Sequence, residues 1–430
     1  MSAPTPKEAR ALIRSLGRGT AGASGARFLH VGHQRWLAAQ EELLLEIAED
    51  GHAEARFVRG AYGAGKSHFL AIVQDRARRA NWLTCHVECR ADGVQIDRFE
   101  TLLPQIVGKL DAGEDAAPSR SMPRDPLIQL LRRWTANLKR DARIRDGDIS
   151  RPLEADRRMW TLLQDRFADT ALHGDFVRAL LVFARADLAR DQAAASSIGR
   201  WMRGGERVRV SGVYLAVPGS TAADVDLQPI GVGNARAVMR GLLWLVRAAG
   251  YEGLLLCIDE VEEIAKLGSR RRQDQALQAL REFVDHCGGE GDFRRLCLFL
   301  AATPEMFEGA NWFPRYDALT TRIQPIGGGI SWRGPVVDLD RTALAESDLR
   351  QMAENIREVF VIAHGEVARA IDLSPLVHEV SRSAYRIAKP RLLARVVVDA
   401  LQNNREDPGG VIDAAQAIGE AALALDTEAA

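Results

Sequence analysis

Residues 55–70 read ARFVRGAYGAGKSHFL, a short apolar strand that runs into a glycine-rich turn and then into a helix. The eight residues from Gly60 to Ser67 fit the pattern GxxxxGK[ST] at every fixed position. Glycines let the backbone curl so that successive N–H groups point inward, and the helix start adds free N–H groups and a partial positive charge. Such a turn binds phosphates, so the sequence predicts a nucleoside triphosphate site.

The chemistry of this turn gives each residue an expected role. Lys66 is expected to reach the β- and γ-phosphates, and Ser67 to hold Mg²⁺. The other predicted cofactor-binding positions are Gly60, Ala61, Tyr62, Gly63, Ala64, Gly65 and His68. The predicted cofactors are therefore ATP and Mg²⁺.

A second signal is an uninterrupted apolar run from Gly253 that ends in Asp259 and Glu260. Such a run is typical of a parallel strand covered on both faces. Asp259, at the carboxyl end of this strand, is expected to lie beside the Mg²⁺ held by Ser67. Glu260 would orient or deprotonate the attacking water. Glu262 and Glu263 are alternatives for that base, but we expect them to fall on the next helical turn and face solvent.

Four further residues are candidates for sensing or stabilising the γ-phosphate. Thr303 ends another buried strand, where it would hydrogen-bond the attacking water or simply begin the turn before Pro304. Arg315 and Arg322 precede the last strand, where either would reach a neighbouring subunit's nucleotide or pair with surface acids. Arg391 follows Pro390 at the start of a helix, from which it could swing onto the phosphates.

Strands and helices alternate along much of the chain, which predicts an α/β fold with a doubly wound parallel sheet. Residues 1–25 are rich in Pro, Gly, Ser and Arg and read as a loosely ordered N-terminus. Residues 26–340 are the predicted P-loop ATPase domain, with a helical insertion at about 100–215. In that insertion, the stretch from Arg132 to Arg145 is a possible polyanion contact, although a solvated helix face is favoured. Residues 341–430 are the predicted all-helical C-terminal lid domain.

Composition limits the class of protein. The formal net charge of -1 gives no overall attraction to nucleic acid or to anionic membranes. Five scattered cysteines suit a reducing cytosol, and a zinc site at Cys85-His86-x-x-Cys89 is disfavoured because that stretch reads as a strand with no second ligand pair. The N-terminus has no apolar secretory segment, and no apolar run reaches the roughly 18 residues that span a membrane. We therefore expect a cytoplasmic protein without a membrane partner.

The order of these parts resembles the AAA+ class of P-loop ATPases, most closely its initiator/STAND-like branch. By this resemblance Thr303 matches the sensor-1 position, Arg322 the arginine finger and Arg391 the sensor-2 position. Three phrases look more specifically like the ATP-binding proteins of bacterial phage-exclusion (BREX) clusters, the BrxD-like family. They are FVRGAYGAGKSHFL (57–70), NARAVMRGLLWLVRAAGYEGLLLCIDEVEEI (234–264) and KPRLLARVVVDAL (389–401). The resemblance covers most of residues 26–405, and the long helical insertion departs from the minimal AAA+ pattern.

The resemblance implies a Mg²⁺-dependent ATPase that works as a switch or motor in phage defence. It also implies other phage-defence proteins as partners and a homo-oligomer in at least one state. Two alternatives remain open at this point. One is a nucleotide-gated binding module that recruits partner proteins with little turnover. The other is an initiator-like DNA loader that contacts DNA through its helical tail or through Arg270, Arg271 and Arg272.

Overall fold

The computed structural model describes residues 3–18, 25–90, 98–113, 125–145, 152–287, 292–324, 330–365, 371–383, 388–407 and 413–429. Within these residues, six strands form one sheet in the order β3-β2-β6-β7-β1-β8. Its strands are β1 (Ala53–Arg59), β2 (Leu83–Glu88), β3 (Leu110–Asp111), β6 (Leu254–Asp259), β7 (Leu296–Ala302) and β8 (Val336–Asp338). All neighbouring pairs are parallel except the antiparallel pair of β2 and the short edge strand β3. The mostly parallel α/β sheet expected from the sequence is confirmed.

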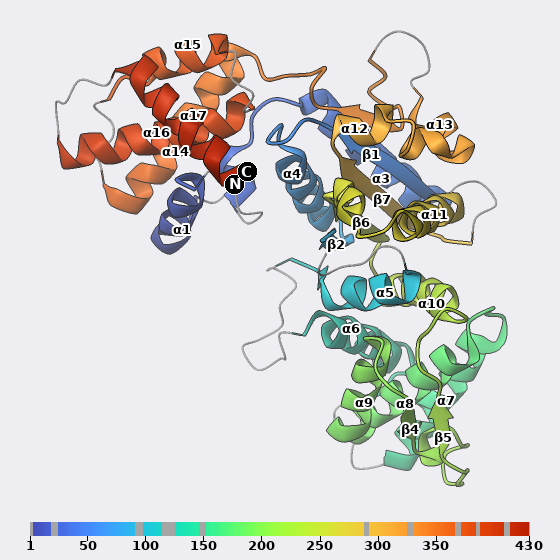
Figure 1. Cartoon of the computed structure of the whole chain (residues 1–430). Coiled ribbons are helices and arrows are strands. Elements are labelled where there is room, and N and C mark those ends of the chain that lie inside the picture. Colours follow the sequence, from blue (N-terminus) through green and yellow to red (C-terminus); the bar gives the residue numbers. More distant parts are fainter. Residues whose placement is uncertain are drawn as a thin grey trace.

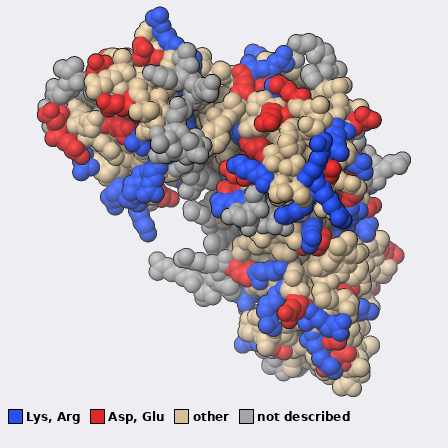
Figure 2. Space-filling view, viewed as in Figure 1, with Lys and Arg blue, Asp and Glu red and all other residues tan. Residues whose placement is uncertain are grey.

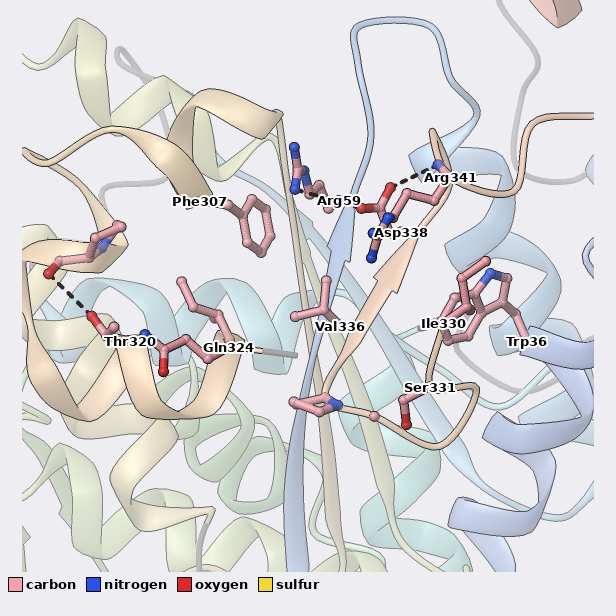
Figure 3. A pocket seen from close by; sticks show the side chains of 14 residues that line it. Trp36, Arg59, Phe307, Thr320, Gln324, Ile330, Ser331, Val336, Asp338 and Arg341 are labelled. Atoms are coloured by element: carbon pink, nitrogen blue, oxygen red, sulfur yellow. Dashed lines mark hydrogen bonds and ion pairs between the residues drawn. The ribbon is translucent and has the colours of Figure 1, made fainter. Parts of the chain in front are cut away.

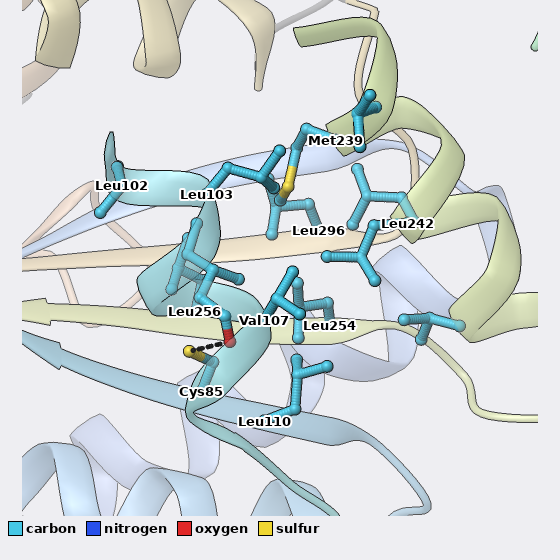
Figure 4. Packing of buried hydrophobic residues seen from close by; sticks show 14 of the residues in the cluster. Cys85, Leu102, Leu103, Val107, Leu110, Met239, Leu242, Leu254, Leu256 and Leu296 are labelled. Carbon is cyan, nitrogen blue, oxygen red and sulfur yellow. Dashed lines mark hydrogen bonds between the residues drawn. The ribbon is translucent and has the colours of Figure 1, made fainter. Parts of the chain in front are cut away.

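Helices cover both faces of the sheet (Figure 1). Helices α3 (Gln34–Asp50) and α4 (Lys66–Arg79) share one hydrophobic core with alternate strand residues such as Val58 and Cys257. The opposite face packs against α5 (Phe99–Gly108), α10 (Ala235–Ala248) and α11 (Arg270–His286). Figure 4 shows part of this second core, where leucines of α5 and α10 meet those of β6 and β7. Every residue of β6 and β7 is buried, which explains their unbroken apolar sequences.

The strand order brings the ends of three strands to one edge of the sheet. β1 pairs with β7, and β7 pairs with β6, all in parallel. Since parallel strands end at the same edge, the loop after β1, the acids after β6 and Thr303 after β7 lie along one line. The P-loop, Asp259, Glu260 and Thr303 therefore gather at this edge.

A helical insertion separates β2 from β6. Beyond α5 it contains α6 (Pro126–Asp141), α7 (Pro152–Ala168), α8 (Gly174–Ala189) and α9 (Gln192–Met202). It also contains a small antiparallel pair that the sequence did not predict, β4 (Val208–Val210) with β5 (Val225–Leu227), and between them the 3₁₀ turn η4 (Gly212–Tyr214). These strands are three residues each, too short for an alternating pattern to be recognised. Figure 1 shows the insertion extending away from the sheet, beyond α5 and α10.

Besides α11, the connections from β6 to β7 and from β7 to β8 contain short helices. η5 (Val261–Lys266) follows β6, and α12 (Pro304–Glu308), η6 (Phe313–Arg315) and α13 (Asp317–Ile323) lie between β7 and β8. They carry Glu262, Glu263, Arg315 and Arg322. The positions of these side chains are therefore set by turns rather than by long helices.

The C-terminal helical bundle has a hydrophobic core of its own. It comprises α14 (Glu346–His364), α15 (Ser374–Arg382), α16 (Lys389–Glu406) and α17 (Ala414–Ala429), together with α1 (Pro6–Leu16) from the other end of the chain. A short helix, α2 (Ala26–Leu29), contacts both α14 and α4 and so connects the bundle with the phosphate loop helix. Figure 1 places the bundle beside α4.

Helix α1 corrects the expectation that residues 1–25 are loosely ordered. Thr5 caps the helix through the Glu8 N–H, and the Glu8 carboxylate in turn accepts from the Thr5 N–H, with Pro6 at the first turn. The apolar side of α1, which includes Leu12 and Leu16, is buried against α14 and α16. Residues 1–2 and 19–24 lie outside the described residues.

No helix in the described residues combines the length and the apolar character that crossing a membrane requires.

Candidate nucleotide-binding site

The glycine-rich turn lies between β1 and α4 and has the backbone geometry that phosphate binding requires. Gly63 and Gly65 have φ angles of +79° and +97°, in the left-handed region that favours glycine. A Cβ on Gly65 would meet no atom within 4 Å, so the turn is open at this point. Helix α4 begins at Lys66, and the N–H groups of its first turn have no intrahelical partner. These N–H groups can therefore bind an anion.

Lys66 connects the turn to the acidic segment after β6. Its side chain is buried, and Nζ donates to the Gly60 carbonyl over 3.0 Å. The same Nζ lies 3.6 Å from Oε1 of Glu262. The P-loop and the end of β6, almost two hundred residues apart in sequence, therefore converge at the same edge of the sheet.

Asp259 is the last residue of β6 and is 1% exposed. One of its carboxylate oxygens accepts the Glu260 N–H at 2.9 Å, and the other lies 3.6 Å from Nε2 of His86 on β2. His86 is held in turn by Gln74 of α4 through a 3.0 Å contact to Nδ1. Burial lowers the pKa of His86, so this imidazole is neutral and leaves the Asp259 carboxylate without a cationic partner there. Such a carboxylate suits a hard cation.

Glu260 has a backbone conformation unusual for its residue type. Its φ of 56° is left-handed, which a non-glycine residue adopts at an energetic cost and which is concentrated at functional sites. Burial raises the pKa of the Glu260 carboxyl, and the neighbouring charges of Asp259 and Glu88 raise it further. A carboxylate with a raised pKa is a stronger base.

The expectation that Glu262 and Glu263 face solvent is wrong. Both lie in the 3₁₀ turn η5, and their side chains are only 22% and 20% exposed. Glu262 points toward Lys66, while Glu263 binds Lys266 at 2.6 Å. The tighter turn explains this difference, because a 3₁₀ helix after a left-handed residue directs its side chains differently from an α-helix.

Thr303 lies at the end of β7, between the ends of β1 and β6. It is half-buried and is the residue before α12, where its side chain makes no capping hydrogen bond. Both interpretations made from the sequence therefore remain geometrically open for its hydroxyl group.

Arg391, on the first turn of α16, lies against the P-loop. A Cβ on Gly63 would be 3.3 Å from Cβ of Ala388 and 3.5 Å from Cδ of Arg391. The Arg391 guanidinium lies 5.1 Å from the ring centre of Tyr62, close enough for a cation–π contact. Its Nε is buried and makes no hydrogen bond within the described residues. The Arg391 guanidinium thus lies beside the phosphate loop with a hydrogen-bond donor that has no partner in the described residues.

Arg315 and Arg322 have different surroundings. Arg315 forms an ion pair with Asp274, and Arg322 pairs with Asp285 at 2.8 Å. Both acids belong to α11 of the same chain. The structure does not bring either arginine into contact with the P-loop residues.

His68 directs its side chain away from the phosphate turn. Its ring stacks on that of His30, with centroids 5.6 Å apart, and the two rings approach to 3.4 Å between Nε2 and Nδ1. Burial lowers the pKa of both imidazoles to about 4. The main-chain N–H of His68 still belongs to the first turn of α4, so a phosphate contact there would come from the backbone.

One contact of the turn was not anticipated from the sequence. The carboxylate of Asp340, just after β8, accepts the Ala61 N–H at 3.0 Å and so fixes the start of the turn. An acidic residue following the last strand is the only sequence signal for it.

A cavity of about 280 Å³ lies between α13 and β8 (Figure 3). Arg59 and Asp338 line it and face each other at 3.6 Å, but it contains none of the predicted site residues.

The candidate metal ligands are oxygen donors. Ser67 is exposed on the first turn of α4, and Asp259 is buried at the end of β6. No group of three or more His, Cys, Asp or Glu side chains that would hold a metal occurs in the described residues. Cys85 and Cys89 are buried thiols, and Cys85 donates to the Ile106 carbonyl (Figure 4).

A family whose description is BREX system ATP-binding protein BrxC/D matches residues 5–419. No curated protein matches the chain.

Proposed function

The chain belongs to the family of BREX system ATP-binding proteins BrxC/D, and from this premise we propose that it hydrolyses ATP with Mg²⁺ as an AAA+-type switch or motor. The observation that supports the proposal best is the 3.6 Å approach of Lys66 to Glu262. This contact brings a phosphate-binding cation and a segment of carboxylates to the same edge of a parallel sheet. Hydrolysis requires both: one group to hold the phosphates and another to activate water.

The phosphates would be held by the turn and by Lys66. The open backbone at Gly65 and the free N–H groups of α4 provide neutral donors, and the helix start adds partial positive charge. Lys66 would exchange its bond to the Gly60 carbonyl for a phosphate oxygen. Arg391 would add a second cation from the C-terminal helical bundle, which we propose acts as a lid.

The residues present fit a magnesium ion completed by the nucleotide. Mg²⁺ takes oxygen ligands, keeps several waters and uses few protein groups, which agrees with a site made of one hydroxyl and one carboxylate. Ser67 and Asp259 would be these ligands. When bound, the ion would neutralise charge on the β- and γ-phosphates.

Glu260 would accept the proton of the attacking water. Its raised pKa and its position directly after Asp259 support this role, and Thr303 at the end of the neighbouring strand would orient the same water. Arg322 or Arg315 would act only on a neighbouring subunit, since each is paired with α11 in its own chain. We therefore propose a homo-oligomer in at least one state, with other phage-defence proteins as partners.

The test uses the purified full chain and three single variants. We expect Lys66→Ala to lose ATP binding by at least about tenfold, because a charge-assisted phosphate contact contributes roughly 1.5–3 kcal/mol. Glu260→Gln should bind ATP normally and release phosphate at least about 100 times more slowly. Binding is measured by calorimetry and turnover by phosphate release.

Glu262→Gln is the matched control, since it changes the same functional group two residues away. It should keep turnover within a few-fold of the original chain. Normal turnover in Glu260→Gln with loss in Glu262→Gln would transfer the base role to Glu262. ATP binding without phosphate release in the unmodified chain, with and without DNA, would replace the enzyme by a nucleotide-gated binding module.

A further inference from the structure

Helix α1 carries a row of cations on its exposed side. At 100° per residue, Lys7, Arg10 and Arg14 fall within an arc of about 60°, and Arg18 lies in the turn after the helix. All four side chains are exposed. The buried residues of α1, among them Leu12 and Leu16, lie on the opposite side, so packing against the bundle fixes the cations outward.

The bundle adds further basic groups beside this row. Arg405, near the end of α16, donates to Nδ1 of His364 over 2.9 Å. Burial lowers the pKa of His364, and so do the charges of Arg405, Arg10 and Arg14 in that order. Arginines from both ends of the chain therefore surround one imidazole at the end of α14. We call Lys7, Arg10, Arg14, Arg18 and Arg405 the α1 basic surface.

These cations lack the neutralising partners found elsewhere. Arginines of the insertion such as Arg207 and Arg209 pair with Asp226 and Asp224. Within the described residues, none of the cations of the α1 basic surface forms an ion pair with a carboxylate. Figure 2 shows the resulting blue cluster over α1, on the edge of the bundle. Although the net charge of the chain is -1, this surface carries positive charge that no carboxylate of the described residues neutralises by an ion pair.

We propose that the α1 basic surface binds the phosphate backbone of double-stranded DNA. From Lys7 to Arg14 the row extends about 10 Å at 1.5 Å per residue, and duplex DNA presents one charge per about 1.7 Å of its axis over such a length. Lysine and arginine side chains that neutralise these phosphates release the counterions condensed on the DNA, which is the main source of sequence-independent affinity.

The composition of the surface selects this ligand over two others. Single-stranded nucleic acid is usually held by stacking on exposed aromatic rings, and membranes by exposed apolar side chains beside the cations. No large hydrophobic side chain of α1 is exposed, and none is exposed at the described ends of α14 and α16. The proposal does not depend on ATP hydrolysis.

The test measures binding of the full chain to a fluorescent 30-base-pair duplex by anisotropy between 50 and 200 mM salt. We expect affinity to fall linearly on logarithmic axes. The variant K7A/R10A/R14A should bind at least about tenfold more weakly at 100 mM salt, with a salt slope reduced by about 3, or roughly 0.9 per lost phosphate contact. Melting temperature and ATP binding should remain unchanged, because the three side chains point away from the bundle core.

Two control variants distinguish loss of the α1 basic surface from a general loss of positive charge. R166A/R207A/R209A removes the same net charge from paired insertion arginines and should leave DNA binding within about twofold. K7R/R10K/R14K keeps the charges and should retain binding. The proposal is overturned if K7A/R10A/R14A binds duplex DNA as the unmodified chain does, or if both alanine triples lose it equally. Preference for single strands, for an RNA duplex or for anionic vesicles over duplex DNA would also overturn it.

Discussion

The start of α16 and the segment formed by η6 and α13 both supply arginines that the sequence makes candidates for the γ-phosphate, but the two regions hold them differently. Arg391 packs against Gly63 and Tyr62, and its Nε has no hydrogen-bond partner in the described part of the chain. Arg315 and Arg322 are each satisfied by a carboxylate of α11.

This difference determines how much free energy each guanidinium must give up before it can bind a phosphate. A guanidinium with an unmet donor gains a bond when a phosphate arrives, so Arg391 is prepared to act within its own chain. A paired guanidinium must first give up its partner. Arg315 and Arg322 therefore fit a role that begins only when a second chain rearranges α11 and α13.

Arg391→Ala should have the largest effect of any arginine change. Removing one preorganised donor from a charge-stabilising site typically costs about 10²–10³ in rate, so we expect phosphate release to slow by about 100-fold. Arg395→Ala, one turn further along α16 and paired with Asp399, is the matched control and should change the rate by less than about twofold. Equal rates for Arg391→Ala and the original chain would remove the contrast between the two regions.

Much of this site could be predicted from the sequence because its signals are local. The P-loop needs glycines at positions fixed by backbone geometry, and Asp259 ends a strand whose continuous apolar run reflects burial on both faces. Neither inference requires knowledge of distant residues. The mostly parallel sheet followed from the same alternation of patterns.

The parts that were missed depend on contacts between distant segments. Glu262 meets Lys66 because a left-handed residue precedes a 3₁₀ turn, and the letters EVEEI do not distinguish that turn from an α-helix. Helix α1 is stabilised by packing against helices that come more than 300 residues later in the sequence. The start of α1 nevertheless has a local sequence signal, because Thr5 and Glu8 form a capping box with Pro6 in the first turn. The neighbouring glycines and prolines made this signal hard to recognise.

We expect acid to lower the free energy of unfolding through the stacked pair His30 and His68. His30 and His68 stack between α2 and α4, and burial lowers the pKa of each to about 4 from an ordinary 6.5. Between these values the unfolded chain binds protons that the folded chain excludes, so stability falls as pH falls through this window. Each histidine contributes up to about 1.4 kcal/mol per pH unit.

Urea unfolding at pH 7.5, 6.5 and 5.5 measures this effect. His68→Gln should flatten the pH dependence by up to one histidine's contribution, whereas the same change at the exposed His378 should not. An unchanged slope in His68→Gln would mean that the stacked pair does not carry the acid sensitivity.

Tyr62→Ala should produce a smaller effect through Arg391. A cation–π contact at an exposed ring contributes about 0.5–1 kcal/mol, so we expect turnover to change by about two- to fivefold with ATP affinity nearly constant. Tyr62→Phe keeps the ring and should behave as the original chain. A loss in Tyr62→Phe equal to that in Tyr62→Ala would assign the effect to the hydroxyl group instead.

The smallest effect is expected for Arg322→Ala in solutions dilute enough for the chain to be a monomer, as checked by mass measurement. Its ion pair with Asp285 is partly exposed and contributes at most about 1 kcal/mol to stability, and phosphate release should stay within twofold. At concentrations where chains assemble, the same variant should lose turnover, because the arginine would then reach a neighbouring nucleotide. Asp285→Ala frees Arg322 without removing it and should preserve the concentration-dependent rate. If Arg322→Ala slows phosphate release by single chains as much as Arg391→Ala does, then the ion pair with Asp285 does not keep Arg322 from acting within its own chain.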